Sequence, residues 1–134
     1  MNQTFSNYGI WALRILAALI MLQTLFFKFT AADESVYIFS QLGMEPWGRI
    51  GTGVMELIAS ILILYPRTTI YGAGLGAGLM AGAIYFHITK LGFEVQDDGG
   101  QLFIYALLVL LSCLGLLVIY RTQVVRVLSS ITGK

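Results

Sequence analysis

The sequence predicts an all-α fold: an integral membrane four-helix bundle with a short outer interfacial helix between helices one and two. Hydrophobic residues make up 57% of the chain and charged residues only 11%, whereas soluble domains carry about 25% charged residues. Four apolar runs also approach the roughly 20 residues that a helix needs to cross the hydrocarbon layer. These predicted spans are Tyr8–Phe27, Trp47–Tyr65, Thr69–Ile88 and Leu102–Tyr120. With 134 residues, the chain is expected to form one transmembrane domain over residues 1–134.

The first run is predicted to be a retained helix rather than a cleaved signal peptide. No basic residue precedes it, and Lys28 separates it from the only small residues that would suit cleavage, Ala31 and Ala32. The loop that follows contains "DESVYIFSQLG", with Asp33 as a candidate cap and Gly43 as a stop. Apolar residues recur in it at helical spacing, which predicts a short helix on the outer surface.

The second and third runs are joined by Tyr65-Pro66-Arg67. Proline removes a backbone donor and biases the residue before it away from helical geometry. We therefore expect a tight hairpin and two antiparallel neighbouring helices.

The third run begins "YGAGLGAGLMAGAIYFH", which contains two overlapping matches to the nucleotide-binding pattern G-x-G-x-x-A. That pattern binds phosphate only where it follows a strand and opens a helix, and no strand is available here. Small residues at four-residue spacing instead let membrane helices approach closely. We predict a packing stripe of Gly74, Gly78 and Gly82, with Gly72 and Gly76 on a neighbouring ridge.

The fourth run follows "DDGGQ", whose carboxylates would lie favourably near a helix N-terminus. In the tail "RTQVVRVLSSITGK", apolar Val124, Val127, Leu128 and Ile131 recur at helical spacing opposite polar residues, which suits an interfacial helix. If the four spans alternate, one side carries basic residues without acidic ones, namely Arg67, Arg121, Arg126 and Lys134. The positive-inside rule then places both termini in the cytoplasm.

Ionisable side chains within the spans need a partner or a function, because each costs roughly 2.5 to 3.5 kcal/mol at a helix centre. Helical rise places Lys28, Glu56, His87, Gln101 and Tyr105 in the outer half of the bundle. One interpretation is a polar cavity formed by these residues, which binds a lipid headgroup or a quinone-like ring. The other is structural: Glu56 forms a buried ion pair with Arg14, Lys28 or Arg49 that fixes helix register. In the first interpretation Arg14 serves as the counter-ion of Glu56.

Other chemistries are excluded or disfavoured by composition. The single cysteine, Cys113, rules out an intrachain disulfide or a cysteine metal cluster. His87 is the only histidine, so haem or metal ligation would need a second copy or a partner protein. We therefore expect no metal site, and quinone is favoured over haem as a cofactor. The net charge of +1 gives no reason to expect nucleic-acid binding.

Several segments resemble the DoxX family of small four-helix bacterial membrane proteins. They are "LQTLFFKFT", "FSQLGMEPWGRIGTGVMELIASILILYPRTT" and "FHITKLGFEVQDDGGQLFIYALLVLL", and the resemblance extends from Arg14 to Tyr120. It implies a compact bundle in the bacterial cytoplasmic membrane. Family members have been linked to a thiosulfate:quinone oxidoreductase subunit and to membrane oxidoreductase complexes, and distant relatives act as membrane chaperones or cargo receptors. Relatives with thiol redox chemistry use cysteine pairs, which this sequence lacks.

Two functional hypotheses follow. The first is an accessory or subunit of a membrane redox system, with a partner redox protein and a site for a small hydrophobic ligand at Lys28, Glu56, His87, Gln101 and Tyr105. The second is a non-enzymatic interaction or chaperone-like protein whose buried charges are structural, acting with a partner or as a homo-oligomer. The sequence contains no independent catalytic motif, so whether the chain is itself an enzyme stays open.

Overall fold

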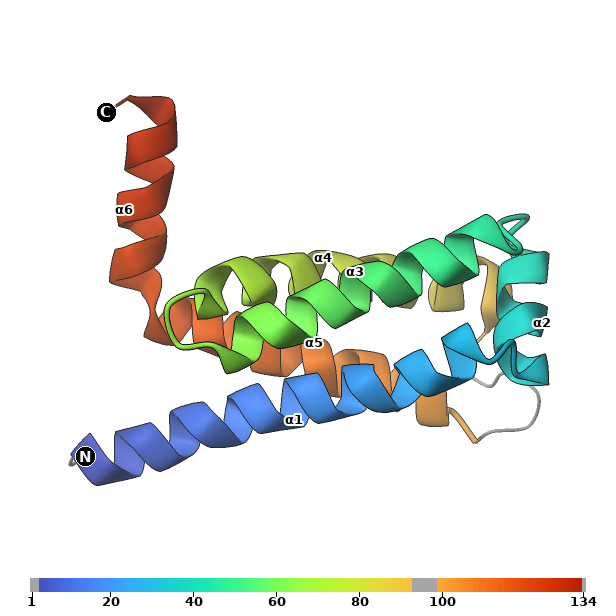
Figure 1. Cartoon of the computed structure of the whole chain (residues 1–134), viewed down its shortest axis with the longest axis horizontal. Helices are drawn as coiled ribbons and strands as arrows, with labels where there is room; N and C mark the ends of the chain where they lie inside the picture. The colour runs from blue at the N-terminus through green and yellow to red at the C-terminus, as the bar shows by residue number, and fades with distance from the viewer. Residues whose placement is uncertain (1–2, 93–98, 134) are drawn as a thin grey trace.

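The computed structural model describes residues 3–92 and 99–133. Its elements are α1 (Gln3–Phe29), α2 (Asp33–Gln41), α3 (Trp47–Leu64), α4 (Thr69–Phe86), the π-helical segment η1 (His87–Leu91), α5 (Gln101–Ile119) and α6 (Arg121–Thr132). The helices α1, α3, α4 and α5 form a bundle, α2 crosses one end, and α6 projects from the other (Figure 1). We call these the α2 end and the termini end. The predicted all-α four-helix fold is confirmed.

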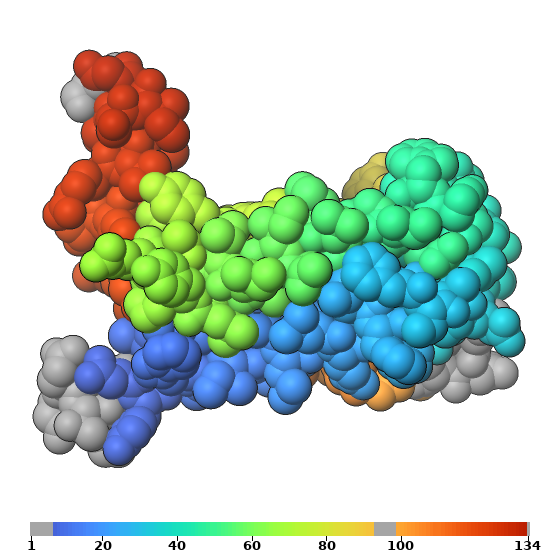
Figure 2. Space-filling view, viewed as in Figure 1, coloured from blue at the N-terminus to red at the C-terminus, as the bar shows by residue number. Residues whose placement is uncertain are grey.

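The protein is an integral, multi-pass membrane protein. Four helical stretches are long and apolar enough to span a bilayer: Asn7–Phe29, Trp47–Leu64, Thr69–Leu91 and Gln101–Ile119. The outside of the bundle carries exposed apolar side chains along every span, among them Leu19, Ile61, Tyr85 and Leu111. The space-filling view shows one elongated body from which only α6 stands apart (Figure 2). Such a surface suits lipid tails rather than water.

The four spans pack in a ring, because α1 and α4 each contact both α3 and α5. Small and medium-sized side chains fill the centre, including the fully buried Ala17, Ala59, Ile63, Ala73 and Val109. Small residues allow the helices to approach closely, which is how membrane helices gain packing energy when lipid is as apolar as the helix surface.

The predicted hairpin between the second and third spans is present. Tyr65 has an extended backbone (ψ 120°) and ends α3, and α4 starts four residues later. Two threonines of the hairpin bond the last carbonyls of α3: Thr68 Oγ1 donates to Leu62 O at 2.8 Å, and Thr69 Oγ1 donates to Ile63 O at 3.1 Å. These bonds satisfy groups that a helix end would otherwise leave unpaired inside the membrane.

The predicted surface helix is α2, and it packs onto the end of the bundle through the buried Ser35 and Phe39. Gly43 has a positive φ of 72° just after it, as expected of a stop. Asp33, however, is not the cap: it is the first residue of the helix, and the N-cap is Ala32, with no side-chain cap bond. The Asp33 carboxylate still lies in the first turn, where the helix dipole favours it.

The tail forms the predicted helix α6, none of whose described residues is buried. Val125, Leu128 and Ile131 are exposed, so this helix keeps an apolar face outside the bundle, as an interfacial helix would. The carboxylates of "DDGGQ", Asp97 and Asp98, lie outside the described residues.

The glycine prediction for the third span needs correction. A Cβ added at Gly74, Gly78 or Gly82 would meet no atom within 4 Å, so this stripe does not pack against another helix of the chain. The glycines that lie close to other helices are those of the neighbouring ridge, Gly72 and Gly76. A Cβ at Gly72 would lie 2.6 Å from Ile63 N and 2.7 Å from Ala59 O of α3, and one at Gly76 would lie 2.9 Å from Cys113 Sγ of α5.

This difference between the two ridges predicts opposite effects of alanine. We expect Gly72→Ala to lower the free energy of unfolding by about 1 to 3 kcal/mol, because the new methyl group meets backbone that cannot move aside. The matched control Gly74→Ala should preserve or raise stability, since it adds helix propensity in open space. Thermal unfolding of both variants in the same detergent measures this. Equal stabilities would contradict the assigned packing.

Candidate functional site

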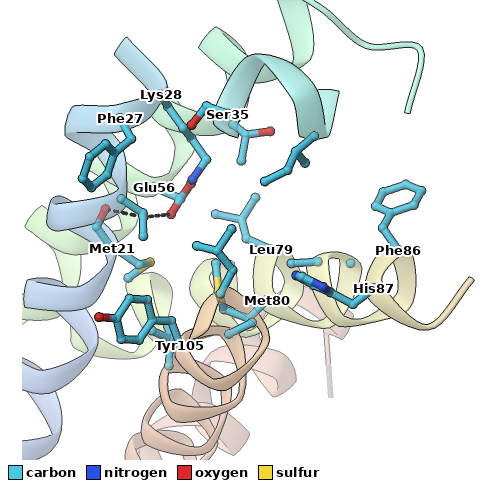
Figure 3. Close-up of a pocket in the computed structure, with 18 of the residues that line it drawn as sticks. Met21, Phe27, Lys28, Ser35, Glu56, Leu79, Met80, Phe86, His87 and Tyr105 are labelled. Carbon is cyan, nitrogen blue, oxygen red and sulfur yellow. Dashed lines mark hydrogen bonds and ion pairs between the residues drawn. The ribbon is translucent and has the colours of Figure 1, made fainter. Parts of the chain in front are cut away.

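A cavity of about 450 Å³ occupies the bundle next to α2. Its walls come from α1, α3, α4 and α5, and residues of α2 line it at the end of the bundle. All five predicted ligand-binding residues line it: Lys28, Glu56, His87, Gln101 and Tyr105. Lys28 and Tyr105, which are 77 positions apart in the sequence, therefore line the same cavity. Figure 3 shows many of the side chains that line it.

The central polar contact is an ion pair between Lys28 and Glu56. Lys28 Nζ lies 2.8 Å from Glu56 Oε1, and Thr24 Oγ1 donates to Oε2 at 3.2 Å. Figure 3 shows the lysine of α1 extending toward the carboxylate of α3. Glu56 is only 2% exposed, so both of its oxygens depend on these contacts in a region that water does not solvate.

The predicted pair between Arg14 and Glu56 is wrong. Arg14 lies ten residues before Thr24 on α1, which is about 15 Å along the helix at 1.5 Å per residue. Its guanidinium instead donates from Nη2 to the Tyr120 hydroxyl at 2.5 Å and lies 4.6 Å from the centre of the Trp11 ring. Among the described residues no carboxylate pairs with Arg14, although it is only 3% exposed. Aromatic rings and a phenol replace the expected anion.

The third candidate partner of Glu56, Arg49, has a different role. Its Nε donates to both oxygens of Glu45, at 2.9 and 3.0 Å, and its Nη1 donates to the Lys28 carbonyl at 2.5 Å. This guanidinium therefore ties the start of α3 to the last turn of α1. The Lys28 backbone is held in place while its side chain reaches the carboxylate.

His87 begins the π-helical segment η1, and its ring is 5% exposed. Its Nδ1 lies 2.9 Å from Gly92 O, and the ring contacts Phe103 edge to face at 5.5 Å. A carbonyl oxygen can only accept, so Nδ1 carries the hydrogen in this contact. In the neutral ring Nε2 is then an acceptor, and in the charged ring it is a donor. No described residue bonds Nε2, and π-helical turns are common at functional sites.

Gln101 and Tyr105 lie one turn apart on α5. Gln101 Nε2 donates to the Tyr105 hydroxyl oxygen at 2.7 Å. Because the phenol accepts this bond, its own hydrogen is available to a further acceptor.

Sequence reasoning missed Thr24 and the apolar wall, to which Met21, Leu79 and Met80 contribute. Thr24 precedes Lys28 by four residues, so the two share a helix face, and this spacing was the available signal. Among the described residues no group of three or more His, Cys, Asp or Glu side chains could hold a metal ion.

The observed pairing predicts the outcome of two double-mutant cycles. Lys28→Met and Glu56→Gln should each lower the free energy of unfolding, and the double variant should lose less than their sum by roughly 0.5 to 3 kcal/mol, because the two side chains contact each other. Arg14→Met combined with Glu56→Gln should be additive within about 0.5 kcal/mol. Detergent unfolding curves give both values. Coupling of Glu56 to Arg14 but not to Lys28 would refute the assignment.

Comparison with known proteins supports one family. A family model described as the DoxX-like family matches residues 12–116. No match was found among curated proteins or among solved structures. The matched stretch covers most of the chain and includes every residue of the cavity lining, from Ile20 to Val109. This four-helix integral membrane protein therefore belongs to the DoxX-like family.

Proposed function

We propose that the cavity binds the ring of a quinone or a similar small amphipathic molecule, and that the protein is an accessory or subunit of a quinone-linked membrane redox system. One observation carries this proposal: the five predicted polar side chains, from different parts of the chain, line a single cavity, and most of its other lining residues are apolar. Its volume of about 450 Å³ falls within the range of ligand sites.

The chemistry of the lining suits a ring with carbonyl groups. A quinone offers two acceptor oxygens, and two of the lining residues carry donors, the Tyr105 hydroxyl and the Lys28 ammonium. The reduced quinol would offer hydroxyl hydrogens, for which His87 Nε2 and the Glu56 carboxylate are acceptors. Donors and acceptors in one site support binding of both redox forms.

Orientation and cellular location form part of the same proposal. Arg67, Arg121 and Arg126 lie at the termini end, and the positive-inside rule would place that end in the cytoplasm. In a bacterial cytoplasmic membrane the cavity would then lie in the outer half of the bilayer. The chain has one cysteine, which is buried, so in this proposal a partner redox protein supplies or removes the electrons.

The second candidate function is a non-enzymatic interaction or chaperone-like protein. The observation that favours it is the closed pair of Lys28 and Glu56 at 2.8 Å, which could serve only to hold α1 against α3. The two candidates differ in whether anything occupies the cavity.

Co-purification tests the two candidates against each other. Mass spectrometry of lipids and quinones extracted from the detergent-purified protein should find a quinone, and Glu56→Gln should lose it, because Lys28 then loses the ion pair that positions it and the quinol loses a carboxylate acceptor. The melting temperature of the variant is recorded alongside. A folded Glu56→Gln protein that retains the quinone removes Glu56 from the site, and wild-type protein that never carries or binds one refutes the function.

Tyr105 offers a milder test. Tyr105→Phe should weaken quinone binding by roughly 5- to 10-fold, the value of about one hydrogen bond. Tyr85→Phe removes a hydroxyl from an exposed tyrosine of the lipid-facing surface and should leave binding unchanged. Quenching of intrinsic fluorescence by added quinone measures both. Equal affinities for the two variants would contradict a role for the Tyr105 hydroxyl.

A further inference from the structure

The cavity reaches the lipid-facing side of α4. On this helix the inward direction is marked by the buried Gly76 and Met80. Gly78 lies two residues from Gly76, which is about 200° around a helix of 3.6 residues per turn. It is exposed, yet it lines the cavity together with Gly82. The cavity therefore extends past the edge of α4 rather than ending inside the bundle.

The edge involved is the one that faces α3. Gly72 marks this edge, because a Cβ there would meet Ala59 O and Ile63 N of α3. Leu79, two turns further on, continues it toward the α2 end, where α3 contributes only Thr52 and Glu56 to the lining. Gly82, which also lines the cavity, lies about 80° around the helix from Gly72. At Gly82 no atom lies within 4 Å of an added Cβ. The contact between α3 and α4 is thus tight near their hairpin and open beside the cavity.

Packing within the chain does not account for glycine at these two positions. Glycine is a poorer helix former than alanine, and nothing within 4 Å would obstruct a side chain at Gly78 or Gly82. A side chain there would instead project into the opening between the cavity and the lipid.

The end of the bundle offers a less direct route. Ser35 and Phe39 of α2 are buried and line the cavity, so this helix covers it from the end. Three other exposed residues line the cavity away from the glycines. They are Gln23 and Phe27 of α1 and Gln101 of α5. The side chains of these three residues border the cavity on the side of α1 and α5. On the side of α4, by contrast, Gly78 and Gly82 contribute no side chain.

We propose that the ligand carries a single hydrocarbon chain, enters from the bilayer between α3 and α4, and leaves its chain in the gap over Gly78 and Gly82 while its ring occupies the cavity. This inference rests on the proposed function and specifies its ligand as a lipid-type molecule. It follows from a cavity that is lined by the buried polar groups Glu56 and His87 and also by Gly78 and Gly82, of which Gly78 is exposed and neither has an atom within 4 Å of an added Cβ.

The test compares two probes on the full-length protein in nanodiscs: a benzoquinone with a decyl chain and the same ring without it. Gly78→Leu and Gly82→Leu should weaken binding of the decyl probe by at least about tenfold, because the leucine occupies the volume of several chain methylenes. The tailless probe should bind these variants as it binds the wild type. The matched control is Gly74→Leu, which lies one turn away, has equally open space and does not line the cavity.

The possible results distinguish failure of the proposed entry route between α3 and α4 from failure of the proposed function. If wild-type protein binds neither probe, the proposed function fails. If the wild-type protein binds both probes and all three variants bind the decyl probe as tightly as the wild type does, the entry route is refuted while the proposed function stands. Loss of both probes in the Gly78 and Gly82 variants would mean that leucine fills the ring site, which also overturns the route. An effect of Gly74→Leu as large as the others, with loss of a dimer in size-exclusion profiles, would assign the stripe to contact between copies instead.

Discussion

The ion pair between Lys28 and Glu56 is the constraint on which the rest of the structure depends. A carboxylate that is 2% exposed within a membrane span must have its charge compensated locally, and Lys28 Nζ at 2.8 Å does this. The pair sets the register of α1 against α3. Arg49 reinforces this register by bonding the Lys28 carbonyl and Glu45. The polar region is thus fixed near α2, at a depth where the neighbouring helices also contribute His87, Gln101 and Tyr105.

The two halves of the bundle differ in packing, and this difference locates the cavity. Near the hairpin, Gly72 and Gly76 bring α4 against α3 and α5 at distances that exclude a methyl group. Ala59, Ile63 and Cys113 fill the space there without any exposed surface. Toward α2 the helix α4 is less closely packed, since a Cβ at Gly78 or Gly82 would meet no atom within 4 Å, and polar side chains line unfilled volume there. A short chain thereby combines a close-packed half that supports the fold with an open half that can accept a ligand.

Much of this arrangement could be predicted from the sequence, because apolar composition and helix-breaking residues such as proline determine local structure. Apolar length predicted the four spans, Pro66 predicted the hairpin, and helical rise placed Lys28, Glu56 and His87 in the outer half of the bundle. The rotation of each helix about its axis could not be predicted. That rotation decides that Gly72 rather than Gly74 meets α3. The partner of Arg14 was missed for another reason: Arg14 lies about 15 Å along α1 from Thr24, which contacts Glu56, and it bonds Tyr120 instead. The π-helical turn at His87 also left no signal in a single sequence.

We propose that the space beside the Lys28–Glu56 pair holds the ring of a membrane ligand. Photo-crosslinking with an azidoquinone, followed by peptide mass spectrometry, tests this occupancy. Adducts are expected on cavity-lining residues such as Met80 or Tyr105, and competition by unlabelled quinone should remove them. Adducts confined to lipid-facing positions such as Ile61 or Leu111, unaffected by the competitor, would contradict it.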